Sequence, residues 1–264
     1  MNALEIQGLS KNFGGLQVLH DVSLTIHAGE RVAIIGPNGA GKTTFFSIIT
    51  GAQRPSAGHI HLFGEDVTTC SAQERTHMGL GCSFQINHLF FSLSVLDNVL
   101  MALHGVKKSR YSMVRATNSY QDVQEEARHL LQSIQLWEKR LEPVGAISYG
   151  EQRKLEIILG LASRPRLIVL DEPTAGLSLN EIPHFIETIK NLAANITVLF
   201  TSHDMEVVFG LAERLVVLYY GQIIADGTPD AIQNDAKVRE IYLGVEEAVI
   251  GERTFTGRCL PKTE

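Results

Sequence analysis

Three short apolar runs each end abruptly in small or polar residues, and this pattern constrains the fold more than any other feature of the chain. Residues 31–35, 167–170 and 196–200 form the runs, which lead into a glycine, an aspartate and a Thr-Ser-His triplet. Strands that are apolar on both faces are typical of parallel sheets covered by helices on both sides. Open sheets of this kind bind ligands outside the carboxyl ends of their strands. The sequence therefore predicts an α/β fold whose ligand site lies where these runs end.

The first run continues into a complete phosphate-binding loop pattern, Gly-Pro-Asn-Gly-Ala-Gly-Lys-Thr, followed by a helix to Thr50 that Gly51 ends. Glycines allow the backbone N–H groups of such a loop to wrap around phosphate groups. The pattern predicts that Lys42 reaches the β- and γ-phosphates and that the Thr43 hydroxyl ligates Mg²⁺. The residues expected to bind the nucleotide here are Gly36, Pro37, Asn38, Gly39, Ala40, Gly41, Lys42, Thr43 and Thr44.

A second helix start with phosphate-binding character lies more than a hundred residues further along the chain. Ser148 and Glu151 have the spacing of a capping box, with Tyr149 and Gly150 between them. The N-terminus of a helix presents unpaired N–H groups and a partial positive charge, which suits an anion. We therefore predict that residues 148–151 also contact a nucleotide phosphate.

Two adjacent carboxylates and a histidine follow the other two apolar runs. Asp171 ends a buried strand and is predicted to hold Mg²⁺. Glu172 is predicted to be the general base for the attacking water, or the group that orients it. His203 lies just beyond the third strand, where it would hold the γ-phosphate and Glu172 in line.

Two further candidates rest on less specific signals. Gln85 lies between the predicted core and a helical region, where its amide would contact Mg²⁺ or the attacking water; a structural role for a single glutamine remains open. Phe13 is either a stacking platform for adenine or a core residue, and the sequence does not decide between these.

The middle of the chain has a helical period rather than a strand pattern. Apolar residues recur at helical spacing from Val95 to Leu103, where Gly105 is expected to end the helix, and again from Val123 to Ile134. We predict a helical subdomain over about 90–160, inserted into a core that spans about 4–89 and 161–244. Half-buried antiparallel strands are predicted near the N-terminus, and residues 245–264 form an unassigned tail.

Composition limits the environment and the partners. The net charge of −6 argues against a nucleic-acid partner, which usually requires a basic surface. The three cysteines have no disulfide or zinc spacing, which fits a reducing compartment. No apolar run approaches the ~20 residues that span a bilayer, and the N-terminus has no basic segment typical of a signal peptide. We therefore expect a cytoplasmic protein, which can still dock on a membrane protein.

In this order, the motifs resemble those of the ATP-binding-cassette ATPases, over about residues 4–244. The resemblance implies the fold of that family: a P-loop NTPase (RecA-like) core, an N-terminal antiparallel β subdomain and an inserted α-helical subdomain. It implies that Glu172 is the catalytic carboxylate and that Phe13 stacks on adenine. It also implies that two ATPase domains pack head to tail around two ATP molecules with Mg²⁺. Residues 148–151 would then contact the ATP held by the partner.

Several segments further resemble the ATPase subunits of branched-chain amino acid transporters, a branch that includes urea and short-amide importers. They include residues 11–16, 94–99, 202–205 and 241–244. This resemblance implies ATP-driven solute uptake through integral-membrane permease subunits and, indirectly, a solute-binding protein. It implies a peripheral location on the cytoplasmic face of the membrane. The partner ATPase would be a copy of the chain or a sister subunit.

Two departures and two alternatives remain. Tyr149 replaces a frequent glycine, which is tolerable if only backbone N–H groups touch phosphate. Ser178 replaces a frequent aspartate in a loop that normally contacts the other subunit, which leaves open how tightly the two nucleotide sites are coupled. One alternative is a soluble ATPase of the same family that acts on ribosomes or nucleic acid; the single cassette and the acidic charge disfavour it. The other is a kinase or GTPase, which would not explain residues 148–152.

Overall fold

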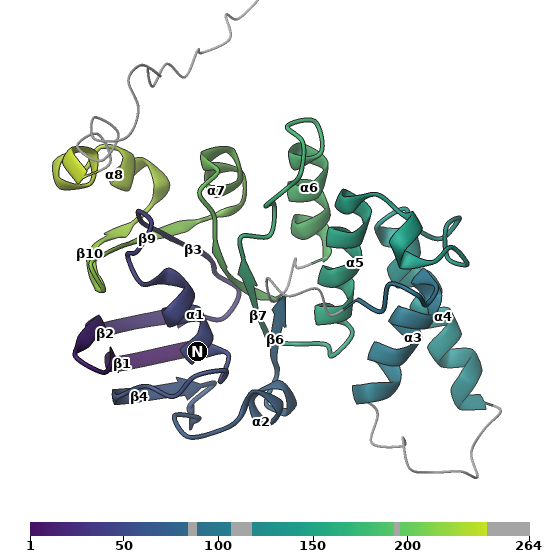
Figure 1. The fold of residues 1–264 in the computed structure, drawn as a ribbon, viewed down its shortest axis with the longest axis horizontal. Coiled ribbons are helices and arrows are strands. Elements are labelled where there is room, and N and C mark those ends of the chain that lie inside the picture. Colours follow the sequence, from purple (N-terminus) through teal and green to yellow (C-terminus); the bar gives the residue numbers. More distant parts are fainter. Residues whose placement is uncertain (84–88, 107–117, 193–195, 242–264) are drawn as a thin grey trace, which may run out of the picture.

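The computed structural model describes residues 1–83, 89–106, 118–192 and 196–241, and its centre is a six-stranded sheet (Figure 1). The sheet order is β10-β9-β3-β8-β7-β6. Its strands are β3 Arg31–Ile35, β6 Leu80–Ser83, β7 Leu167–Asp171, β8 Thr197–Thr201, β9 Arg214–Tyr219 and β10 Gln222–Gly227. Strands β6, β7, β8, β3 and β9 are parallel, and β10 forms an antiparallel hairpin with β9.

The three apolar runs are therefore adjacent strands, β3, β8 and β7, and the sheet is buried on both faces as predicted. Successive side chains of a strand point to opposite faces. Ile34 accordingly lies in one hydrophobic cluster and Ala33 in another, and the same holds for Val169 and Ile168. A strand that is apolar on both faces fits only a sheet that is covered on both sides.

A second, antiparallel sheet of four strands comes from the first part of the chain. Its order is β2-β1-β4-β5, with β1 Asn2–Phe13, β2 Leu16–His27, β4 Ala57–Leu62 and β5 Glu65–Asp66. One cluster of buried side chains joins this sheet to α1 (Lys42–Ile49) and to one face of the six-stranded sheet. The short α2 (Ala72–His77) precedes β6.

Three helices belong to the opposite side of the six-stranded sheet. They are α6 Ile182–Leu192, α7 Met205–Leu211 and α8 Pro229–Gln233. Their apolar residues share a cluster with the strand residues of that face, including Phe185 with Phe200. The two-sided covering is the arrangement expected of an α/β sheet.

The helical part of the chain lies at the β6 end of the molecule, away from the antiparallel sheet (Figure 1). It contains α3 Val95–Val106, α4 Asn118–Ser133, the 3₁₀ turn Val144–Ala146 and α5 Tyr149–Leu161. Leu155 and Ile158 of α5 pack in the helical cluster, whereas Ile157 and Leu161 pack against the six-stranded sheet. Helix α5 thus joins the two regions.

One helix end was predicted wrongly. Gly105 does not end α3, which continues to Val106. Among the residues that the structure describes, none lies within 4 Å of a Cβ built on Gly105. Among the helices that the structure describes, none has the length and apolarity needed to cross a membrane.

Candidate functional site

The predicted phosphate-binding loop joins β3 to α1 and is closely packed by two other strands. A Cβ on Gly36 would lie 2.1 Å from the Leu218 carbonyl oxygen of β9, and one on Gly41 would lie 2.9 Å from Leu19 Cδ2 of β2. Gly41 also has φ +104, in the region that favours glycine. At these two positions the neighbours leave room for the bare backbone only.

Lys42 lies within this loop and faces the two acidic residues at the end of β7. Its Nζ donates hydrogen bonds to the carbonyl oxygens of Gly36, at 2.6 Å, and Pro37, at 3.1 Å. Burial lowers the pKa of Lys42, and the negative charges of Glu172 and Asp171 oppose that shift. The loop lysine and the two carboxylates therefore form one electrostatic unit.

A threonine on the adjacent strand joins the Asp171 carboxylate to the backbone of Glu172. Thr201 Oγ1 donates to Asp171 Oδ1 at 2.6 Å and accepts from the Glu172 N–H at 2.9 Å. Burial raises the pKa of Asp171; the Thr201 hydrogen bond opposes this shift, and the nearby charge of Glu172 adds to it. Carboxylate and hydroxyl oxygens are the hard ligands that Mg²⁺ prefers, so Asp171 and Thr43 fit the predicted metal role.

His203 lies where the sequence predicted it, next to Glu172. Its Nδ1 is 3.2 Å from Glu172 Oε2. The imidazole is largely exposed, with 72% of its side-chain surface accessible, while the Glu172 side chain is only 27% accessible. A carboxylate held by a histidine at the edge of the sheet can orient or deprotonate a water molecule.

The predicted capping box at the start of α5 is present. Ser148 Oγ accepts from the Glu151 N–H at 3.3 Å, and Glu151 Oε2 accepts from the Ser148 N–H at 2.9 Å. Lys139 Nζ is 2.8 Å from the other oxygen of Glu151. Within the described part of the chain, the side-chain hydrogen bonds of Ser148 and Glu151 go only to each other and to Lys139. Figure 1 shows α5 on the opposite side of β7 from β1 and β2.

Phe13 is not a core residue, because 46% of its surface is exposed. It lies at the tip of the β1–β2 hairpin, and Lys11 Nζ is 5.0 Å from the centre of its ring. An exposed ring of this kind can stack on a base, and the adenine role stays a prediction. Gln85 and the tail 245–264 lie outside the described residues.

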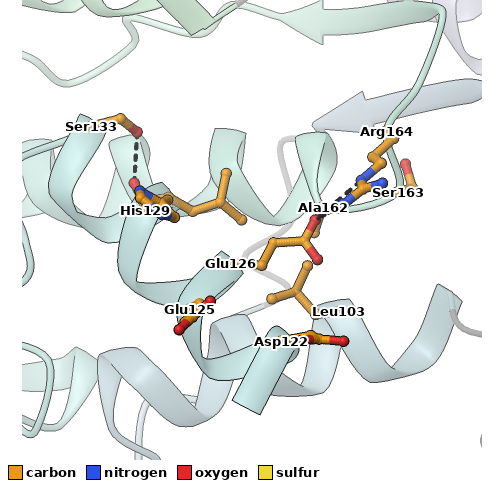
Figure 2. A pocket seen from close by; sticks show the side chains of 10 residues that line it. Leu103, Asp122, Glu125, Glu126, His129, Ser133, Ala162, Ser163 and Arg164 are labelled. Carbon is orange, nitrogen blue, oxygen red and sulfur yellow. Dashed lines mark hydrogen bonds and ion pairs between the residues drawn. The ribbon is translucent and has the colours of Figure 1, made fainter. Parts of the chain in front are cut away.

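A cavity of about 810 Å³ lies elsewhere, between α4 and the end of α5 (Figure 2). Asp122, Glu125 and Glu126 line it, and Glu126 pairs with Arg164 at 2.7 Å. None of the predicted site residues lines this cavity. It is separate from the strand ends that carry the carboxylates.

Several residues that shape the site were not predicted from the sequence. The sequence indicated Thr201 only as a residue at the end of a strand. Its hydrogen bond to Asp171 could not be predicted because it depends on the register of β7 and β8. Arg153 and Glu156 form a buried ion pair on α5. Glu181 accepts hydrogen bonds from Ser178 and lies against Gly150. The one available signal was the Ser-x-x-Glu spacing of 178–181, which is another capping-box pattern.

Comparison with known proteins agrees with this geometry. Residues 19–175 match the family described as ABC transporter, and residues 222–248 match the one described as branched-chain amino acid ATP-binding cassette transporter. The high-affinity branched-chain amino acid transport ATP-binding protein BraF of Pseudomonas aeruginosa is 36% identical, over 91% of this chain and 97% of its own. LivG of Escherichia coli K12, a protein of the same description, is 37% identical with the same coverage. The lipopolysaccharide export system ATP-binding protein LptB of Acidithiobacillus ferridurans is 38% identical, over 91% of this chain and 96% of its own.

Solved structures have the same fold. An ATP-binding cassette of an ABC transporter in its ADP conformation is 29% identical, with a TM-score of 0.81 over 92% of this chain and 99% of that chain. A dimeric post-hydrolysis cassette bound to ADP and phosphate is 25% identical, with a TM-score of 0.73 over 85% of this chain and 98% of that chain. The strand-end carboxylates, the glycine loop and the capped helix α5 thus occur in the architecture of a known nucleotide-hydrolysing family. The chain belongs to the ABC transporter family, as an ATP-binding subunit that hydrolyses ATP.

Proposed function

We propose that this protein powers the uptake of branched-chain amino acids, or of a related small amide, through membrane permease subunits. The observation that carries the proposal is the convergence of Lys42, Asp171, Glu172 and His203 at the carboxyl ends of adjacent strands. The likeness to BraF and LivG, together with the match at residues 222–248, supports the solute class.

In this proposal the glycine loop and Lys42 bind the ATP phosphates, and Phe13 stacks on adenine. Thr43, Asp171 and Gln85 would hold Mg²⁺, which would supply positive charge against the phosphates. Glu172 accepts a proton from the attacking water or orients it, and His203 fixes Glu172 in place. The aligned water attacks the γ-phosphate, and ADP leaves.

We further propose that the helix start at 148–151 serves an ATP molecule bound to a partner ATPase, which is a second copy or a sister subunit. Within this chain Ser148 and Glu151 use their side chains to cap α5, which leaves the amide-rich helix end for an anion. The chain by itself is then a poor ATPase. It works as a dimer at the cytoplasmic face of the membrane, seated on the permease and supplied by a solute-binding protein. No nucleic acid is involved.

The test of the catalytic assignment is Glu172→Gln in the full chain. We expect it to keep ATP binding, lose turnover by on the order of 10²-fold or more, and accumulate an ATP-bound dimer. Unchanged hydrolysis would remove Glu172 from this role. Ser148→Arg is expected to leave ATP binding to the monomer intact and to block dimer closure. Loss of ATP affinity in the monomer would overturn the trans assignment.

The solute is tested separately, because the likeness to LptB leaves lipopolysaccharide export as a second candidate. The chain is purified from membranes with its associated subunits and reconstituted in vesicles. ATP-dependent accumulation of labelled leucine, isoleucine or valine is expected, with urea and acetamide as the competing solutes. ATPase activity stimulated by lipopolysaccharide, without accumulation of any of these solutes, would favour export.

A further inference from the structure

We propose that Thr201 is a positioning residue for ATP hydrolysis, because its hydroxyl fixes the Asp171 carboxylate and the Glu172 backbone at the same time. The proposal deepens the function proposed above and rests on the catalytic role of Glu172. Thr201 itself does not need to contact ATP; it acts through its two neighbours.

The pairing of β7 with β8 places this hydroxyl between the Asp171 carboxylate and the Glu172 backbone amide. Asp171 and Thr201 are the last paired residues of the parallel strands β7 and β8. Thr201 is fully buried. Its Oγ1 lies 2.6 Å from Asp171 Oδ1 and 2.9 Å from the Glu172 amide nitrogen.

The Thr201 hydroxyl acts as a donor in one of the two hydrogen bonds and as an acceptor in the other. A threonine hydroxyl has one proton to donate and lone pairs to accept with. An ionised carboxylate can only accept, so the proton of Oγ1 goes to Asp171 and a lone pair receives the Glu172 N–H. The direction of both hydrogen bonds is thereby fixed, and one hydroxyl joins the Asp171 carboxylate to the Glu172 backbone.

The bond to the Glu172 amide matters because this residue has an unusual backbone. Glu172 has φ +45, in the left-handed region that side-chain-bearing residues rarely adopt. Such conformations persist where the surroundings over-determine them, and they cluster at functional sites. Thr201 Oγ1 restrains the amide on which that φ depends, and the same conformation brings Glu172 Oε2 to 3.2 Å from His203 Nδ1.

Thr201→Val is the sharpest substitution, because valine keeps the shape and the β-branch and removes only the hydroxyl. We expect kcat to fall by about 10- to 100-fold, since a small displacement of a catalytic group has effects of this size. The affinity for ATP should change by less than about 3-fold, because the glycine loop and Lys42 are unaffected. Thr201→Ser retains the hydroxyl and should recover most of the lost kcat.

Thr197→Val is the matched control. Thr197 lies at the other end of β8, is equally buried, and its hydroxyl accepts from the Gly29 N–H at 2.9 Å. It makes the same kind of bond on the same strand, far from the carboxylates. We expect it to leave kcat unchanged even where it lowers the unfolding temperature.

The experiment measures kcat, KM and ATP affinity of the full chain in the assembled transporter. If Thr201→Val does not fold, Thr201→Ala provides a second variant without the hydroxyl, and the comparison with Thr201→Ser is unchanged. The proposal is overturned if the variants without the hydroxyl keep wild-type kcat, if Thr201→Ser is as impaired as they are, or if kcat and ATP affinity fall together.

Glu172→Gln separates this proposal from the one on which it rests. If Glu172→Gln hydrolyses ATP normally, the catalytic assignment is wrong. If Glu172→Gln is inactive while Thr201→Val is fully active, only the positioning role is wrong. In the inactive Glu172→Gln background, Thr201→Val should cause little further loss, because the two residues act as one unit.

Discussion

The ring of Tyr149, at the start of α5, lies directly against Gly176 in the loop after β7. A Cβ on Gly176 would be 2.6 Å from Tyr149 Cε1 and 3.1 Å from Cζ. The next residue of α5 is equally constrained, because a Cβ on Gly150 would be 2.4 Å from Glu181 Oε1. Residues 176–181 therefore pack against the helix start that is proposed to bind the partner's ATP, and Tyr149 is accommodated by a glycine opposite it.

Gly176→Ala is expected to destabilise the fold for two separable reasons. Gly176 has φ +83, which costs about 1–2 kcal/mol for a residue with a side chain, and its new methyl group would collide with the Tyr149 ring. Tyr149→Ala removes the ring and should relieve only the collision. Urea unfolding of the single and double variants should give a non-additive cycle, with a coupling free energy of about 0.5–3 kcal/mol. Strict additivity would mean that the loop moves away from the ring without cost.

Ser178→Ala is expected to weaken the start of α6 in a pH-dependent way. Glu181 Oε2 accepts from the Ser178 hydroxyl at 2.6 Å and from its N–H at 2.9 Å, and these bonds lower the pKa of Glu181. A lowered pKa contributes stability that is present above the unfolded-state pKa near 4.5 and is lost as the pH falls through the folded-state pKa.

The wild-type protein should therefore be more stable than Ser178→Ala at neutral pH by about 0.2–1 kcal/mol, because solvent screens the charge of the exposed Glu181 carboxylate. The difference should shrink as the pH falls below about 4.5, and urea unfolding at several pH values measures it. Ser178→Asp should not restore the stability of the wild-type protein, because aspartate cannot donate a hydrogen bond to the Glu181 carboxylate. A difference that is constant across this pH range would show that the hydroxyl has no role in holding Glu181.

Replacing one partner of the ion pair inside α5 is expected to lower the free energy of unfolding strongly. Replacing both partners by apolar residues is expected to lower it much less. Arg153 and Glu156 are 5% and 8% exposed, and Arg153 Nη1 is 2.5 Å from Glu156 Oε2. Arg153 Nε and Glu156 Oε1 are buried and have no hydrogen-bond partner among the residues that the structure describes. Glu156→Leu should destabilise the chain by about 3–5 kcal/mol, because it removes the buried carboxylate that pairs with Arg153. The double variant Arg153→Met, Glu156→Leu should recover most of that loss in denaturant unfolding.

Gly36→Ala is expected to disturb folding as well as nucleotide binding. Its Cβ would lie 2.1 Å from a backbone oxygen of β9, which cannot move without shifting the central sheet. Overpacking of this kind costs about 1–3 kcal/mol or more. Gly105→Ala is the control, since nothing lies within 4 Å of its Cβ position and alanine favours a helix. Equal melting temperatures for the two variants would contradict the close packing of the loop.

Local patterns allowed much of the fold to be predicted. The strands β3, β7 and β8 were identified from runs of apolar residues, and the loop before Lys42 from its glycines. The capping box of Ser148 and Glu151 was identified from a three-residue spacing, and the structure contains it. Each of these features depends on interactions between residues close together in the chain, so the sequence itself carries the information.

Other features became visible only in the tertiary structure. Phe13 was undecided between core and surface until the hairpin tip placed it in solvent. The extent of α3 beyond Gly105 also depended on its surroundings, because a glycine ends a helix only where the chain is required to turn.

The sequence by itself determined that this chain has a glycine loop, a capped second helix start and acidic strand ends. Only the tertiary structure decided that Thr201 joins Asp171 to Glu172 and that Gly176 makes room for Tyr149. Asp171 and Thr201 are 30 residues apart in the chain, and Tyr149 and Gly176 are 27 residues apart. Their contacts depend on strand register and loop packing, since a shift of one residue in β8 would turn the Thr201 hydroxyl to the other face of the sheet.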